Sequence, residues 1–210
     1  MKNTHVINHP LITHKISILR DKETKPANFR RLVGDIAQLE AYEALKDIAT
    51  HKETIETPLE TMDAIKIDET NICLVPILRA GLGMSDGISH MLPYASVGHI
   101  GLYRDETTHE AHEYYARFPK TVADMDVLLL DPMLATGGSA IDAVRQLKAR
   151  GVKRISFLCI IAAPEGVARF EKEFPDIPLY IGALDRELNS NCYILPGLGD
   201  AGDRVFGTID

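Results

Sequence analysis

A short stretch in the middle of the chain has the residue types and the spacing of a phosphate-binding site. Four aliphatic residues, 127–130, precede Asp131, and Thr-Gly-Gly-Ser occupies residues 136–139. Glycines let backbone N–H groups turn towards an anion with no Cβ atom in the way, and the hydroxyl groups add donors. Residues 140–148 then show helical spacing, so the positive end of a helix dipole faces the loop. We predict a buried strand, an anion-binding loop and a helix, with Asp131 placed to meet hydroxyl groups or a cation beside the phosphate.

Two common nucleotide-binding loops do not fit this stretch. It lacks the Gly-x-x-x-x-Gly-Lys-Ser/Thr pattern of a P-loop. No Gly-x-Gly-x-x-Gly run opens a predicted strand–helix unit, which argues against a dinucleotide fold. A sugar phosphate fits better than a nucleoside triphosphate, and an ordinary tight turn is the alternative.

Residues 131–139, Asp-Pro-Met-Leu-Ala-Thr-Gly-Gly-Ser, resemble the 5-phosphoribosyl-1-diphosphate (PRPP) loop of type I phosphoribosyltransferases. Most members of that group have two adjacent acids where this chain has Asp131 and Pro132, but the uracil phosphoribosyltransferases share the departure. The resemblance covers nearly the whole chain. It implies that PRPP is bound by Asp131, Pro132, Met133, Leu134, Ala135, Thr136, Gly137, Gly138 and Ser139.

Arg79 follows a second predicted buried strand, residues 71–78, at the edge where ligands collect in open α/β sheets. A helix reaching about Leu92 is predicted to start beside it, and the dipole of that helix disfavours a cation there. We therefore favour a functional role for Arg79 over the alternative that it is an ordinary surface arginine. Residues 76–84, Pro-Ile-Leu-Arg-Ala-Gly-Leu-Gly-Met, also resemble the uracil phosphoribosyltransferases, which implies that Arg79 binds PRPP.

A polar stretch, residues 104–119, follows a third predicted strand at residues 95–103. A loop of this length inside a compact domain is usually a lid or an active-site flap. We expect Arg104 at its base to clamp a diphosphate, with Tyr114 and Tyr115 closing over the site to exclude water. Type I phosphoribosyltransferases carry such a hood, and the Tyr-Arg-Asp-Glu run here resembles the uracil members.

Residues 192–208 concentrate glycines and aspartates, which predicts several positive φ values around a close contact. A flat pyrimidine needs apolar faces and a few main-chain donors and acceptors. Ile194 can lie against such a ring, the backbone at Gly199 and Ala201 can meet its edge, and Asp200 can orient it or accept its proton. A structural turn is the alternative. The run closely resembles the base-binding segment of the uracil phosphoribosyltransferases, which implies that these four residues bind uracil and that Asp200 also contacts PRPP.

The resemblance implies the reaction of uracil with PRPP to give UMP and diphosphate, a step of pyrimidine salvage. It implies catalytic roles for Asp200, Arg104 and Arg79, and Mg²⁺ that arrives with PRPP instead of sitting in a protein cage. His109 and His112 are spaced poorly for zinc, and we interpret them as solvated loop residues.

The expected partners are the small molecules uracil and PRPP, with GTP as an effector in some family members. Arg30 and Arg31 could bind an anionic effector, although paired arginines on a long helix are usually a solvated face. We expect a homodimer or a homotetramer.

Two alternatives remain open. A purine or orotate phosphoribosyltransferase would share the fold, but orotate calls for a cation beside the base, and residues 192–203 contain no lysine or arginine. A pyrimidine-responsive RNA-binding regulator on the same fold would need a basic face. The net charge of -7 and the lack of a clustered basic stripe argue against it.

The composition is that of an ordinary globular protein. The 210 residues, 45% hydrophobic and 25% charged, suit one α/β domain spanning residues 1–210. No apolar stretch approaches membrane-spanning length, and no signal segment opens the chain, so we expect a cytoplasmic protein without a membrane or nucleic-acid partner. Cys73, Cys159 and Cys192 lack paired spacing and are expected to be reduced, buried thiols.

Strands alternate with helices along the chain, which predicts a mostly parallel sheet flanked by helices. This is the type I phosphoribosyltransferase fold, here with N-terminal helices, a β-hairpin hood and a C-terminal base-binding segment. Further strands are expected at residues 154–163 and 178–183, with a helix between them, and a β-hairpin at residues 52–69. Two helices, within residues 1–25 and 26–50, are expected to pack on a partner subunit or to form a flap.

Overall fold

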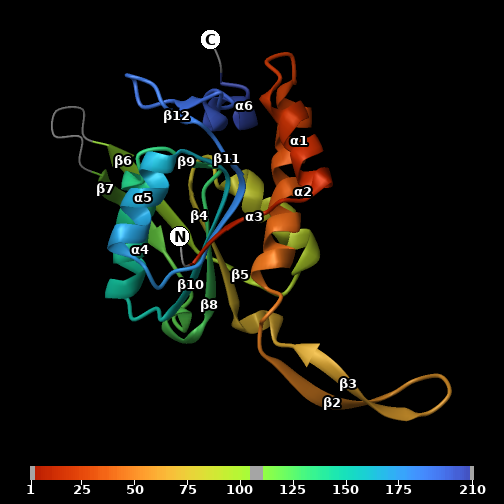
Figure 1. The fold of residues 1–210 in the computed structure, drawn as a ribbon. Coiled ribbons are helices and arrows are strands. Elements are labelled where there is room, and N and C mark those ends of the chain that lie inside the picture. Colours follow the sequence, from red (N-terminus) through yellow and green to blue (C-terminus); the bar gives the residue numbers. More distant parts are fainter. Residues whose placement is uncertain (1–2, 105–110, 209–210) are drawn as a thin grey trace.

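A nine-stranded sheet runs through the molecule (Figure 1). The computed structural model describes residues 3–104 and 111–208, and of residues 102–104 and 111–113 it describes the backbone alone. The strands lie in the order β1, β11, β10, β8, β4, β6, β7, while β5 and β9 pair with β4 and β10. All pairs are parallel except β6 with β7, so the predicted mostly parallel sheet is confirmed. The strands are β1 (Thr4–Val6), β4 (Ile72–Leu78), β5 (Ser96–Val97), β6 (His99–Arg104), β7 (Ala111–Arg117), β8 (Asp126–Leu130), β9 (Met133–Leu134), β10 (Arg154–Ala162) and β11 (Leu179–Leu184).

Helices cover both faces of this sheet (Figure 1). Helices α1 to α3 pack on one face, α4 and α5 pack on the other, and α6 joins the first core from the carboxyl end of the strands. Within the described residues, no helix combines the length and the apolar character needed to cross a membrane. The helices are α1 (Pro10–Arg20), α2 (Pro26–Ala44), α3 (Leu82–Met91), α4 (Gly138–Ala149), α5 (Pro164–Glu173) and α6 (Ala201–Phe206), with short 3₁₀ turns η1 (Glu69–Asn71) and η2 (Val122–Asp124).

The central strand β8 is buried on both faces. Val127 and Leu129 belong to the core beneath α4 and α5, whereas Leu128 and Leu130 belong to the core beneath α1 to α3. Successive side chains of a strand point to opposite faces, so a strand between two helical layers must be apolar at every position. The unbroken aliphatic run predicted this strand correctly for that reason.

Of the two expectations for the N-terminal helices, the flap was wrong, whereas packing on a partner subunit stays a prediction. Both helices cover their own sheet, and Phe29, Leu32 and Ile36 of α2 are at most 1% exposed. The first residues were also misjudged, because Thr4–Val6 form β1 beside β11. An amphipathic pattern shows that a helix buries one face, but it does not show which surface covers that face.

The predicted β-hairpin hood is confirmed, but the strand that leads into it is divided. The third predicted strand is divided into β5, which pairs with β4 at Cys73 and Leu74, and β6, which pairs with it at Ile77 and Leu78. The polar stretch at residues 104–119 contains β7, which pairs antiparallel with β6 and forms the second strand of this hairpin.

The cysteines are all free, as predicted, but only two are buried. Burial raises the pKa of the Cys73 thiol to about 11 and raises that of Cys159 as well. Cys192 is exposed and has a φ of 62°, so the prediction of a buried thiol was wrong there.

The predicted β-hairpin is confirmed as an arm made of β2 (Thr50–Glu56) and β3 (Thr61–Ile67), which projects away from the body (Figure 1). A second small antiparallel pair, β12 (Glu187–Leu188) and β13 (Ile194–Leu195), lies near the C-terminal end. The arm leaves apolar side chains in solvent: Leu59 is 95% exposed and Ile65 is 64% exposed. Exposed apolar side chains concentrated on one projection indicate a contact surface.

Glu40 is a carboxyl group inside the core, on the buried face of α2. It is 0% exposed, and among the described residues neither of its oxygens has a hydrogen-bond partner of regular geometry. Burial raises the pKa of Glu40 well above its ordinary value of 4.5, although the nearby Gly182 backbone opposes this shift. The side chain is therefore held protonated in the folded protein at pH values where the unfolded chain has released the proton.

We predict that Glu40→Gln removes a pH-dependent loss of stability. Because the folded state retains a proton that the unfolded chain loses above about pH 4.5, the free energy of unfolding of the parent protein falls as the pH rises from there. The Glu40→Gln variant lacks this titration, so its stability relative to the parent increases with pH. Urea unfolding at several pH values measures the difference, with Glu56→Gln on the exposed arm as the control. A parent and variant that keep the same difference from acid to neutral pH would contradict the prediction.

Candidate active site

The predicted anion-binding loop lies at the carboxyl end of β8 and leads into α4. Gly137 occupies the N-cap of α4 with a φ of 80°, in the left-handed region that favours glycine. No side chain of the described residues caps this helix, so the N–H groups of its first turn are open to an external anion. The loop is closely packed from behind, because a Cβ atom on Gly166 of α5 would overlap the Ala135 carbonyl. The arrangement suits a phosphate group at the start of α4.

Asp131 follows β8 directly and is half-buried beside this loop. Its Oδ1 accepts a long hydrogen bond from the Met133 N–H at 3.4 Å, and its own N–H donates to the Leu158 carbonyl at 3.3 Å. Burial raises the pKa of Asp131 from 3.8 to about 7, with a smaller opposing effect from the Met133 N–H. A ligand that donates hydrogen bonds or brings positive charge would favour the ionised form.

Arg79 follows β4, the neighbour of β8 in the sheet. Its exposed guanidinium lies 3.6 Å from the Asp203 carboxylate and 5.8 Å from the centre of the Phe206 ring, both on α6. The turn that carries Arg79 packs tightly on β8, since a Cβ atom on Gly81 would meet the Leu130 carbonyl at 2.5 Å. Arg79 is thus held beside the loop while its side chain stays in solvent.

The C-terminal segment arrives at the same edge of the sheet. Gly197 and Gly199 have φ values of 67° and 79°, which confirms the prediction of left-handed backbone here. Asp200 is the N-cap of α6, and its Oδ1 accepts a hydrogen bond from the Asp203 N–H at 2.9 Å. Residues 197–202 do read Gly-x-Gly-x-x-Gly before a helix, but the preceding strand β13 pairs only with β12, outside any parallel strand–helix–strand unit. A dinucleotide site is therefore still not indicated.

These parts meet around one cavity of about 260 Å³ at the carboxyl edge of the sheet. The end of β4, the anion-binding loop and the start of α6 each supply part of its wall. It is lined by Ile77, Leu78, Arg79, Ala80, Asp131, Met133, Ala135, Ser139, Asp200, Ala201 and Gly202. Ile77, Leu78, Ala80 and Gly202 were not predicted, and their only signal in the sequence is that each lies within two positions of a predicted residue.

The other predicted residues lie around this cavity and not in its wall. Pro132 and Leu134 are buried beneath the loop, and Ile194 is 5% exposed in the core. Thr136, Gly137 and Gly138 lead into α4. Gly199 lines an adjoining cavity of about 380 Å³, which shares Asp200 with the first.

The hood is only partly described. The side chains of Arg104 and His112 and the whole of His109 lie outside the described residues. Tyr114 and Tyr115 are 56% and 45% exposed, and the Tyr114 ring lies so close to Gly101 that a Cβ atom there would overlap it.

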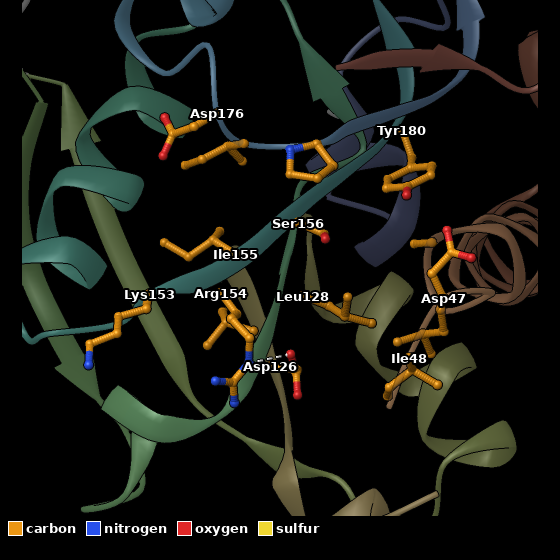
Figure 2. A pocket seen from close by; sticks show the side chains of 15 residues that line it. Asp47, Ile48, Asp126, Leu128, Lys153, Arg154, Ile155, Ser156, Asp176 and Tyr180 are labelled. Carbon is orange, nitrogen blue, oxygen red and sulfur yellow. Dashed lines mark hydrogen bonds and ion pairs between the residues drawn. The ribbon is translucent and has the colours of Figure 1, made fainter. Parts of the chain in front are cut away.

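Another cavity, of about 380 Å³, opens at the opposite, amino edge of the sheet (Figure 2). Asp126 and Arg154, which begin β8 and β10, form an ion pair there at 2.7 Å. Ligands of open α/β sheets bind beyond the carboxyl ends of the strands, where the connecting loops supply N–H groups and side chains. We therefore take the 260 Å³ cavity as the candidate active site.

The donor groups of the cavity fit a metal that enters on a substrate. In residues 3–104 and 111–208, no cluster of three or more His, Cys, Asp or Glu side chains could hold a metal by itself. The cavity wall offers two carboxylates, Asp131 and Asp200. Mg²⁺ keeps several waters and commonly binds one or two carboxylates together with substrate phosphates, so these residues fit it.

Known proteins resemble this chain over nearly its full length. The sequence model of the uracil phosphoribosyltransferase family matches residues 6–208. Uracil phosphoribosyltransferases from Shouchella clausii and Staphylococcus aureus are each 51% identical over 208 residues, which cover 99% of this chain and 100% of the relative. A solved structure of a protein from Aquifex aeolicus has a TM-score of 0.92 at 38% identity and covers 97% of both chains. A purine phosphoribosyltransferase from Pyrococcus horikoshii, with a TM-score of 0.50 at 16% identity over 73% of this chain and 82% of its own, shares the fold alone.

We predict that the Asp131 carboxyl group titrates close to neutral pH in the ligand-free protein. Its burial favours the protonated form below about pH 7 and leaves it ionised only above that value. Carboxyl ¹³C NMR of Asp-labelled protein measures the midpoint, and Asp131→Asn identifies the signal by removing it. A midpoint for this signal below about pH 5 would contradict the prediction.

Proposed function

The chain belongs to the uracil phosphoribosyltransferase family, and we propose that its carboxyl-edge cavity joins uracil to PRPP, giving UMP and diphosphate. The observation that carries this proposal is the single cavity that contains both an open helix start and the glycine-rich C-terminal segment. One part suits a sugar phosphate and the other suits a flat base. The reaction needs both substrates side by side. We regard residues 1–210 as a single phosphoribosyltransferase domain.

The sugar phosphate of PRPP occupies the loop of residues 131–139 in this proposal. The first-turn N–H groups of α4 and the Ser139 hydroxyl donate to the 5′-phosphate, where the helix dipole adds attraction. Asp131 lies beside them, and above its pKa of about 7 its carboxylate accepts hydrogen bonds from the ribose hydroxyls. These contacts hold the sugar in place without covalent chemistry.

In this proposal the diphosphate is bound by cationic side chains. Arg79 is exposed, and its separation of 3.6 Å from Asp203 is that of a weak surface pair, so it can turn to a stronger diphosphate partner. Arg104, at the end of β6, is proposed to clamp the same group from the hood. Mg²⁺ bound to PRPP supplies further positive charge that stabilises the departing diphosphate.

In this proposal the base lies against the C-terminal segment, where Ile194 packs against the ring and the main chain at Gly199 to Ala201 offers donors and acceptors to uracil. Diphosphate leaves C1 of the ribose while N1 of uracil approaches the opposite face, through an oxocarbenium-like state by analogy with other glycosyl transfers. Asp200 lines the cavity and is placed to orient the ring or to accept the N1 proton. Electrostatic stabilisation and positioning supply most of the rate.

The alternatives have less support. The relatives from Shouchella clausii and Staphylococcus aureus carry the name of the enzyme, and neither supports an RNA-binding regulator. Arg30 donates to the Val205 carbonyl at 3.1 Å and Arg31 pairs with Asp35 at 2.8 Å, so both candidates for an effector site are engaged within the chain. Stimulation by GTP and a cytoplasmic location stay predictions.

We predict that Asp200→Asn lowers turnover about 100-fold while PRPP binding is largely retained. Asparagine caps a helix as well as aspartate does, so the variant removes the charge and keeps the start of α6. Steady-state formation of UMP measures turnover, with Asp63→Asn on the exposed arm as the control. Turnover at the parental level would remove Asp200 from the mechanism.

The arm supports a homodimer or a homotetramer, which we propose as the working form. Its apolar side chains Leu59, Met62 and Ile65 are 45% to 95% exposed in a single chain. A second copy of the chain would remove them from water at no cost to the fold.

We predict that the double variant Leu59→Lys, Ile65→Lys shifts the protein towards the monomer, since buried lysines would be unpaired in the contact. Sedimentation velocity at several concentrations measures the shift. Thr54→Lys adds a charge to the same arm without removing an apolar side chain and serves as the control. Unchanged sedimentation of the double variant would show that the arm does not hold the assembly together.

A further inference from the structure

An ion pair between two residues that are far apart in the sequence holds one turn of the base-binding segment in place. We call residues 196–200 the base loop. Arg20, at the last residue of α1, donates through Nη1 to Asp185 Oδ2 at 2.8 Å and to the Gly197 carbonyl at 2.7 Å, and through Nη2 to Asp185 Oδ1. The Asp185 side chain is 4% exposed and that of Arg20 is 23% exposed, so the carboxylate of the pair is shielded from water.

The same carboxylate also binds the other side of Gly197. The Gly197 N–H donates to Asp185 Oδ2 at 2.9 Å, while the Asp185 N–H is fixed to the Ala162 carbonyl of β10 at 2.8 Å. Both polar groups of this glycine are thus attached, through Arg20 and Asp185, to the end of the sheet. Glycine has the greatest backbone freedom of all residues. These contacts restrict that freedom at Gly197, whose φ is 67°.

A second arginine holds the next carbonyl. Arg204 donates to the Leu198 carbonyl at 2.7 Å and to the Asp21 carbonyl at 2.5 Å, and its guanidinium lies 4.4 Å from the centre of the Phe29 ring. The carbonyls of Gly197 and Leu198 are therefore both occupied. Across the described part of the chain, the N–H groups of Leu198, Gly199 and Asp200 have no hydrogen-bond partner.

We propose that the Arg20–Asp185 pair positions the base loop for uracil, an inference that rests on the function proposed above. The carbonyls of Gly197, Leu198 and Asp200 are occupied, the last by the Arg204 N–H, and three N–H groups are free. The loop therefore offers mainly donors, and the oxygens at positions 2 and 4 of uracil are acceptors. Holding these donors in place before binding removes the cost of ordering a glycine-rich loop at the moment of binding. Arg20 and Asp185 touch no substrate in this account and act through the backbone of Gly197.

The test compares Arg20→Lys and Asp185→Asn with the parent enzyme. A lysine keeps the charge, so the fold is retained, but one ammonium group lacks the planar fork that reaches both carboxylate oxygens and the Gly197 carbonyl. We expect KM for uracil to rise about tenfold in each variant, with KM for PRPP within about twofold of the parent value. If either variant fails to fold, Arg20→Gln with Asp185→Asn leaves no buried charge and is measured in its place, with the same expected result.

Lys15→Ala is the matched control. Lys15 also lies on α1 and forms an ion pair, with Asp35 at 2.7 Å, but this pair joins α1 to α2 away from the base loop. It should leave both KM values unchanged. The proposal would be overturned if an Arg20 variant only lowered the fraction of active enzyme, or raised both KM values equally, because either result shows a purely structural role. Unchanged kinetics would overturn it as well. If the parent enzyme converts no uracil, the proposed function itself is wrong. That result differs from one in which the parent is active and the Arg20 variants leave KM for uracil unchanged, which overturns only the present proposal.

Discussion

The parallel pairing of β4 with β8 is the constraint on which the site depends. Its register places Pro76 opposite Leu130, so β4 runs two residues beyond the end of β8, and Arg79 and Asp131 leave the sheet at the same edge. A cation and an acid that are far apart in the chain thereby share one cavity with the start of α4. The two buried cores on either side of the sheet keep this register, because a slip of one residue would turn every aliphatic side chain to the wrong face.

The C-terminal segment is attached to that edge by polar contacts more than by apolar packing. Ile194 and Val205 reach the core, but the turn between them is held through the Arg20–Asp185 pair and through Arg204. Buried charges are tolerated only when their hydrogen-bonding capacity is used, and these are used on backbone carbonyls and on each other. The result is a glycine-rich turn with a defined shape, in which main-chain atoms can serve as a recognition surface.

Local patterns predicted the parts of the fold and site that are encoded locally. β8 and α4 were predicted because a doubly buried strand and an amphipathic helix have distinct periods. Arg79, Asp131 and Asp200 were predicted because each follows a strand or lies at a glycine-rich turn.

Elements and residues whose place depends on partners distant in the sequence were missed. β1 has only three residues and takes its place from β11, and Glu40 lies on an apolar face that the surrounding pattern marks as ordinary. Arg20 and Asp185 are 165 residues apart, so no spacing could connect them. α6 was not predicted because its first residues are small and show no apolar periodicity. Asp200 followed by Asp203 is nevertheless a recognisable signal for the start of a helix.

The uneven exposure of the three thiols has a practical consequence. Cys73 and Cys159 lie within the sheet, whereas Cys192 is open to solvent on the turn that precedes β13. A maleimide dye would therefore attach at a single position, without any engineered cysteine, a few residues from the base loop. The native chain thus carries its own attachment point for a fluorescent reporter of the movements of that segment.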